Sequence, residues 1–139
     1  MGGYLSRMFK DLSQGIKISI SRSISTAFEQ YMTEIEWNEN KFSLEEFVQR
    51  WRNYIINYSS WYEKVNDEMK LNPAFHENLA VKINETIQKL LSEEPTKDQM
   101  EEIEALQKQL GEEYDYSCRM EAKYVIETLK EKLKKKQKL

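Results

Sequence analysis

One continuous apolar stripe constrains the fold of this chain more than any other feature of its sequence. Along residues 44–69, apolar and aromatic side chains recur at steps of three and four, the repeat of an amphipathic helix. Ser43 precedes the stripe and Glu46 follows three residues later, which predicts a capping box. The stripe predicts about seven helical turns. Its members are Leu44, Phe47, Val48, Trp51, Tyr54, Ile55, Tyr58, Trp61, Tyr62, Val65 and Met69.

A second helix is predicted to begin at Asn72 and Pro73. Asn is a favoured N-cap residue, and Pro is favoured at the first helical position. The apolar side of this helix is formed by Phe75, Leu79, Ile83, Ile87 and Leu90. Two amphipathic helices joined by a short turn favour an antiparallel arrangement. We therefore expect residues 43–94 to form a central antiparallel helical pair.

Residues 95–139 predict two more helices, which together make a C-terminal module. Thr96 and Gln99 form a second capping-box pattern, and Gly111 is suited to end that helix as its C-cap. After a short connector, Ser117 is predicted to cap the last helix, whose apolar side is Ala122, Val125, Ile126, Leu129 and Leu133. A lysine-rich tail follows.

Residues 1–42 form an N-terminal arm with a less regular pattern. Helical spacing runs from Leu5 to Ile16 and again from Ile24 to Ile35, which favours two helices with a connector near residues 15–21. Ile16, Ile18 and Ile20 alternate with polar residues, so a short β element at residues 16–21 is the alternative. With four Gly and two Pro, the chain has little turn punctuation for a larger sheet. The predicted fold class is all-α, a small helical bundle with a two-helix C-terminal module.

Charge is distributed unevenly along the chain, although the net charge is only −3. Residues 1–28 carry a net charge of +3, residues 29–116 a net −11, and residues 117–139 a net +5. An acidic body repels phosphates, which disfavours nucleic acid as the main partner. If nucleic acid is contacted, the predicted contacts are Arg119, Lys123, Lys134, Lys135 and Lys136.

Residues suited to catalysis or metal binding are scarce. His76 is the only histidine and Cys118 the only cysteine, so neither an intrachain disulfide nor a zinc site can be assembled from them. There is no Gly-rich phosphate loop and no nucleophile elbow. We therefore predict no enzymatic activity, no metal and no cofactor. The lone cysteine and the lack of an apolar run of roughly 18 residues favour a cytoplasmic protein.

The aromatic part of the 44–69 stripe is the predicted partner-binding face. Trp, Tyr and Arg are enriched at the energetic centres of protein interfaces, and this segment is rich in all three. The alternative is that these side chains form the core against the helix at 73–91. The predicted partner-binding residues are Arg50, Trp51, Tyr54, Tyr58, Trp61 and Tyr62.

The first residues match a loose acylation pattern. Gly2 follows the initial Met and Ser6 lies four residues later, as in N-myristoylation, and nearby basic residues would supply a second membrane signal. A membrane-associated adaptor acting through this segment is therefore one alternative function, although a membrane is the least expected partner.

One stretch resembles a known module. Pro95, Thr96, Gln99, Ile103, Leu106 and Gly111, followed by Glu121, Ala122, Ile126 and Leu129, resemble a short two-helix unit at the ends of bacteriophage and Firmicute mobile-element proteins. The resemblance covers residues 95–133 and implies a small docking or nucleic-acid-proximal unit. The acidic linker at residues 112–116 departs from the usual basic or hydroxyl residue there, which counts against direct DNA contact.

These patterns favour a non-catalytic helical protein that binds another protein. The resemblance suggests that a phage or mobile element encodes it, and that it occludes or recruits a host or element protein. A nucleic-acid accessory factor in replication or recombination is the alternative. Self-association into a homo-oligomer is also compatible with the surplus of aromatic residues.

Overall fold

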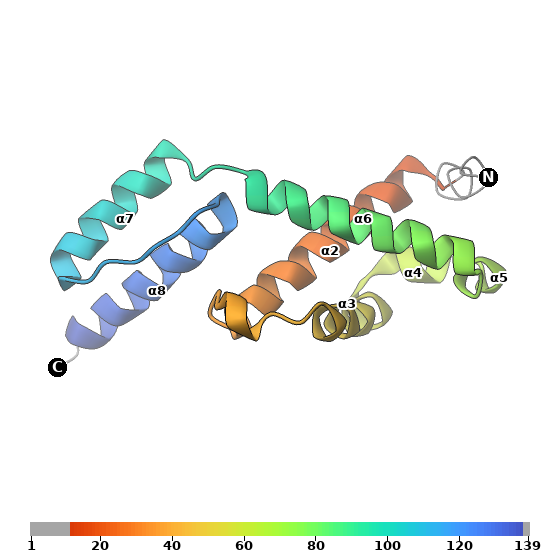
Figure 1. Ribbon diagram of the computed structural model, residues 1–139, viewed down its shortest axis with the longest axis horizontal. Helices are drawn as coiled ribbons and strands as arrows, with labels where there is room; N and C mark the ends of the chain where they lie inside the picture. Colours follow the sequence, from red (N-terminus) through yellow and green to blue (C-terminus); the bar gives the residue numbers. More distant parts are fainter. Residues whose placement is uncertain (1–11, 138–139) are drawn as a thin grey trace. The chain divides into compact units, whose positions relative to one another are not determined.

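The computed structural model describes residues 12–137, and this part of the chain is all-α, with no strand (Figure 1). It divides into two compact units, one running to Ile87 and the other beginning at Gln88. The elements are α2 (Gln14–Glu34), the 3-10 turn η1 (Glu39–Lys41), α3 (Leu44–Tyr58), α4 (Ser60–Lys64), α5 (Asp67–Lys70), α6 (Pro73–Ser92), α7 (Lys97–Leu110) and α8 (Arg119–Gln137).

A single helix, α2, replaces the connector and the β element predicted near residues 15–21. Ser13 caps it by accepting a hydrogen bond from the Ile16 N–H at 3.2 Å. On a helix, Ile16 and Ile20 share a face while Ile18 lies opposite, and Ile20 is accordingly buried while Ile18 is 46% exposed. Both predictions were therefore wrong, because the alternation is also compatible with a helix. The helical spacing predicted from Leu5 begins in residues 1–11, outside the described residues.

α2 ends in a Schellman motif without a glycine. The Trp37 N–H donates to the Met32 carbonyl at 2.8 Å, and the Glu36 N–H donates to the Thr33 carbonyl at 3.0 Å. Glu36 and Trp37 both have positive φ, 57° and 55°, where a side chain is strained. The Trp37 ring packs edge-on against Phe28, with 6.2 Å between the ring centroids. The turn with positive φ thus places the Trp37 ring against Phe28.

The single helix predicted over residues 44–69 is wrong, because the chain breaks twice within it. α3 ends at Tyr58, Ser59 adopts an extended conformation, and α4 lasts only until Lys64. A new cap then forms at Asn66, whose side chain accepts from the Met69 N–H at 2.7 Å. Of the capping box predicted at Ser43, one of the two hydrogen bonds is present. Ser43 Oγ accepts from the Glu46 N–H at 3.3 Å, but the Ser43 N–H donates to the Tyr31 hydroxyl at 3.0 Å.

The break after Tyr58 brings two tryptophans together. The rings of Trp51 and Trp61 stack with 6.3 Å between centroids, whereas on an unbroken helix residues ten positions apart would be separated by about 15 Å along the axis. Both indole N–H groups donate to Ser23 Oγ of α2, Trp51 at 3.0 Å and Trp61 at 3.4 Å. The Ser23 hydroxyl in turn donates to the Ile20 carbonyl at 2.6 Å. We call these three side chains the Ser23–Trp51–Trp61 cluster.

The packing partner of α3 is α2, in place of the predicted helix at 73–91. α2 also packs against α4, so it is the helix around which this part of the unit assembles. The predicted start of α6 is confirmed. The Asn72 side chain accepts from the Ala74 N–H at 2.8 Å, and the helix begins at Pro73.

In the second unit, α7 and α8 lie side by side and run in the same direction (Figure 1). The Arg119 N–H donates to the Glu93 carbonyl at 2.8 Å, and the Gln99 amide donates to the Arg119 carbonyl at 3.2 Å, so both helices start at the same end. The connector, residues 111–118, must therefore travel back along α7. Eight extended residues span at most about 29 Å, which is enough to return along the 14 residues of α7, whose length is about 21 Å.

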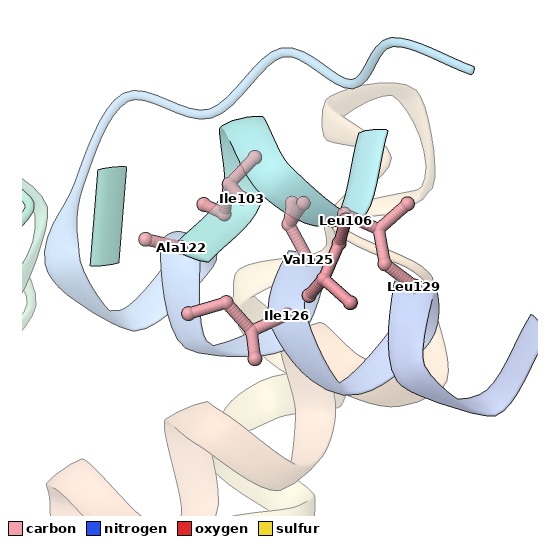
Figure 2. Packing of buried hydrophobic residues seen from close by; sticks show 6 residues of the cluster. All are labelled: Ile103, Leu106, Ala122, Val125, Ile126 and Leu129. Carbon is pink, nitrogen blue, oxygen red and sulfur yellow. The ribbon is translucent and has the colours of Figure 1, made fainter. Parts of the chain in front are cut away.

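The core of this unit lies between α7 and α8 (Figure 2). Its buried members are Ile103 and Leu106 of α7 and Ala122, Val125, Ile126 and Leu129 of α8. Both predicted features of α7 are confirmed: the Thr96–Gln99 capping box, and Gly111 as a left-handed C-cap with φ of 71°. The predicted Ser117 cap is wrong. α8 starts at Arg119, and the Ser117 N–H and hydroxyl both donate to the Glu121 carboxylate, at 2.8 and 3.2 Å.

Candidate functional site

A groove lies between α2 and α3, with a volume of about 390 Å³. α2 contributes Ala27, Gln30, Tyr31 and Glu34 to its lining, and α3 contributes Arg50, Asn53, Tyr54, Asn57 and Tyr58. On each helix these positions follow steps of three and four, so the groove runs along one face of each helix. Arg50, Tyr54 and Tyr58 are three of the predicted partner-binding residues.

Tyrosines give the groove its floor and one wall. The Tyr31 ring is buried, and its hydroxyl accepts a hydrogen bond from the Ser43 N–H. This bond holds the Tyr31 side chain in place at the floor of the groove. Tyr54 is half-buried, whereas Tyr58 is 78% exposed. The rings of Tyr54 and Tyr58 are 5.7 Å apart between centroids and tilted by 39°. An exposed aromatic ring beside a second ring is a surface that gains stabilisation when a partner covers it.

Arg50 is held in place by two carboxylates. Its guanidinium forms ion pairs with Glu34 of α2 and with Glu46 of its own helix, the latter at 3.5 Å. The same guanidinium carbon lies 5.8 Å from the centroid of the Tyr31 ring, within cation–π range. The pairs are exposed to solvent, so their value to stability is small, but they orient the side chain at the end of the groove.

Two of the predicted partner-binding residues are not on the surface. Trp51 is only 3% exposed and Trp61 only 1%, because both belong to the Ser23–Trp51–Trp61 cluster. The expectation of an exposed face is therefore wrong for these two residues. Tyr62 is half-buried, packs edge-on against Trp61 with 5.7 Å between centroids, and carries the Lys70 ammonium 4.2 Å above its ring. Tyr62 does not line the groove.

The residues that α2 contributes to the groove were not predicted from the sequence. Gln30 and Glu34 are exposed polar residues of a helix whose partner could not be identified without the fold. Asn53 and Asn57 of α3 were missed as well, because exposed amides on the polar side of a helix give no signal of a groove by themselves. The groove itself depends on which helix packs against α3.

The predicted nucleic-acid contacts all lie in the second unit, and Arg119 has a structural role there. Its Nε donates to the Glu94 carbonyl at 3.1 Å, and its Nη1 lies 3.4 Å from the Glu93 carboxylate. These bonds attach the start of α8 to the segment before α7. Lys123 is exposed, as are Lys134, Lys135 and Lys136 in the last turn of α8.

Lys132 fastens the connector to α8. Its ammonium donates to the Tyr114 hydroxyl and forms an ion pair with Glu112 at 3.4 Å. The hydrogen bond to Tyr114, helped by Glu112, raises the pKa of Lys132 above its ordinary value. This lysine therefore belongs to the packing of the unit rather than to a free basic surface.

Groups with catalytic potential are apart from the groove. His76 is exposed and its Nε2 lies 2.5 Å from the Lys70 carbonyl oxygen, while Cys118 is buried in the other unit. Within residues 12–137, no group of three or more His, Cys, Asp or Glu side chains is arranged to hold a metal ion. None of the helices described combines the length and the apolar character needed to cross a membrane. The Gly2 acylation pattern lies outside the described residues.

Comparison with known proteins adds no relative. The chain matches no protein-family model, no curated protein and no solved structure.

Proposed function

We propose that this protein acts by binding another protein through the groove between α2 and α3. The observation that carries the proposal is the convergence of Arg50, Tyr54 and Tyr58 on one groove, with Tyr58 78% exposed. Tyr and Arg are the residue types that dominate the binding energy of protein interfaces.

We propose further that the protein is not an enzyme. Catalysis requires acids, bases or nucleophiles in mutual reach. The groove contains one carboxylate, Glu34, and that group is paired with Arg50. The tyrosines and amides around it are groups that contact a partner rather than transfer protons to it. A role in occluding or recruiting a partner fits these side chains best.

The experiment is affinity capture from a lysate of the cells that make the protein, with two matched variants. Tyr58→Ala removes the exposed ring of the groove, whereas Ile56→Ala removes a 58% exposed side chain of the same helix that lies outside it. We expect wild type and Ile56→Ala to recover the same protein and Tyr58→Ala to lose it. Equal recovery by all three, or recovery of no protein, would contradict the proposal.

We propose also that a phage or mobile element encodes the protein and that it acts in the cytoplasm; the resemblance of residues 95–133 supports the first point and the single cysteine the second. On this proposal the captured protein belongs to the host or to the element itself. The C-terminal unit would then serve as an accessory docking module. The operon in which the gene lies tests this proposal, because replication and counter-defence functions are encoded with different neighbours.

A second candidate function, a nucleic-acid accessory role, is favoured by one observation. Lys134, Lys135 and Lys136 are all exposed and take part in no ion pair among residues 12–137. Contacts between lysines and phosphates strengthen as salt is lowered. Titration with single- and double-stranded DNA at low salt, comparing wild type with a triple Lys→Gln variant at these positions, tests it. If no binding depends on these lysines at low salt, this function is removed.

A further inference from the structure

The dimensions of the groove restrict what it can hold. On α2 the lining runs from Ala27 to Glu34, and on α3 from Arg50 to Tyr58, which is about two helical turns on each side. Two turns correspond to a length of about 11 Å. An extended chain covers that length with three or four residues. The groove is therefore matched to a short linear segment.

The amides at the rim favour a segment with unpaired carbonyls. Gln30, Asn53 and Asn57 are exposed along the groove. The Asn57 amide donates to the Asn53 carbonyl at 2.9 Å, which orients the side chain and leaves it a second N–H. A helical partner satisfies its own carbonyls, whereas a polyproline II segment has no internal hydrogen bonds and presents them to its surroundings. An extended segment therefore makes more use of these amides than a helix does.

The tyrosine wall favours proline side chains in that segment. Tyr54 and Tyr58 present two neighbouring rings to the groove, and Ala27 leaves space at the floor. Proline-rich segments dock on grooves lined by aromatic rings, and their restricted backbone loses little entropy on binding. The groove combines aromatic rings with amide donors, which are the two features that such a segment requires.

Charge distinguishes the two ends of the groove. At one end, Arg50 is shared between the carboxylates of Glu34 and Glu46, so two negative charges face one positive charge. Glu46 lies in the first turn of α3, where the helix dipole stabilises an anion. Glu34 is the last residue of α2, where the dipole disfavours one. A positively charged side chain of the partner, placed beside Glu34, would balance the excess negative charge at this end of the groove.

From these observations we propose that the groove binds an extended, proline-containing peptide segment that carries one basic residue. The proline rings pack against Tyr54 and Tyr58, the amides of Gln30, Asn53 and Asn57 donate to its carbonyls, and the basic side chain lies beside Glu34. This inference rests on the proposed function, since it specifies the partner of the same groove.

The test uses three acetylated, amidated peptides: five prolines followed by one arginine, five prolines followed by one glutamate, and a glycine–serine peptide ending in arginine. Each is titrated into the isotope-labelled full-length protein, and amide resonances of α2 and α3 are followed. We expect the proline–arginine peptide to bind most tightly, with shifts that concentrate at residues 50–58. Tyr58→Ala should weaken binding about tenfold or more, whereas Tyr58→Phe and Ile56→Ala should preserve it.

A substitution at Glu34 tests the expected preference for the arginine peptide. Glu34→Gln should remove the difference between the arginine and glutamate peptides without abolishing proline binding, because only the charge at one end changes. Equal binding of the glycine–serine peptide, or a thymidine oligonucleotide that produces the same shifts more strongly, would overturn the proposal. If no peptide binds while protein capture still depends on Tyr58, this inference fails and the proposed function stands. If capture is independent of Tyr58 as well, both fail.

Discussion

The indole N–H of Trp51 donates a hydrogen bond at 3.0 Å to the Oγ of Ser23, which lies 28 residues earlier in the chain. Trp61 donates to the same oxygen at 3.4 Å, and the Ser23 hydroxyl donates its own hydrogen bond to the Ile20 carbonyl. All three bonds are buried. A single serine thus satisfies two large aromatic side chains from two other helices.

Replacing Ser23 with Ala should destabilise the protein by about 2 kcal/mol or more, because two buried indole N–H groups lose their acceptor. Urea unfolding followed by far-UV circular dichroism measures the loss. Ser21→Ala is the matched control, since Ser21 is on the same helix and contributes no side-chain bond to this cluster. That variant should stay within about 0.5 kcal/mol of wild type. Equal stability of the two variants would contradict the role of the cluster.

Replacing Glu36 with Gly should stabilise the protein, by up to about 1 kcal/mol, because glycine adopts the left-handed conformation without strain. The gain is partly offset by the greater freedom of glycine in the unfolded chain. Thermal unfolding checks the direction. Glu39→Gly, three residues later in η1 and without a positive φ, should lower the unfolding temperature instead. A fall in both variants would show that the Glu36 turn is not strained.

Two glycines should respond oppositely to alanine. Gly15 lies in α2, where an added Cβ would meet only Ser13 Oγ at 3.9 Å, so Gly15→Ala should stabilise by about 0.5 kcal/mol. Gly111 has φ of 71° and open space around the added Cβ. Gly111→Ala should therefore cost about 1 kcal/mol through backbone strain alone, without a clash. Unfolding in urea measures both, and changes of the same sign would contradict the assignment of the Gly111 cap.

Leu129→Ala should remove about 2–5 kcal/mol from the stability of the α7–α8 unit, because Leu129 is fully buried in its core (Figure 2). Leu91, which is 42% exposed, provides the control in the same unit. Its replacement by Ala should change stability by less than about 0.5 kcal/mol. Hydrogen exchange of the α8 amides localises the effect, and unchanged exchange there would refute the core assignment.

Local signals in the sequence were sufficient to predict the fold class and most helix starts. Thr96 with Gln99, Asn72 with Pro73, and Gly111 each act through backbone groups a few residues away, so their effect is readable without the fold. Ser43 shows the limit of that reasoning. Its hydroxyl caps α3 as predicted, but its N–H is taken by Tyr31, twelve residues earlier.

The errors arose where distant contacts outweigh local preference. The stripe over residues 44–69 contains no Gly or Pro at its breaks, and its apolar spacing continues through the weak helix formers Ser59, Ser60 and Asn66, so the spacing alone predicts one helix. The chain nevertheless breaks after Tyr58, since only then can Trp61 stack on Trp51 and reach Ser23. The same contacts buried the two tryptophans that had been predicted as partner contacts. The groove could not be predicted either, because it requires knowing that α2 packs against α3.

The positions of the tryptophans have a spectroscopic consequence. The chain contains three, Trp37, Trp51 and Trp61, and all of them lie in the unit that runs to Ile87. The unit that begins at Gln88 has none. Fluorescence excited selectively at tryptophan therefore reports the state of one unit, while the α7–α8 pair is silent in that signal. Unfolding of the first unit can thus be followed by itself in the intact chain, without any label.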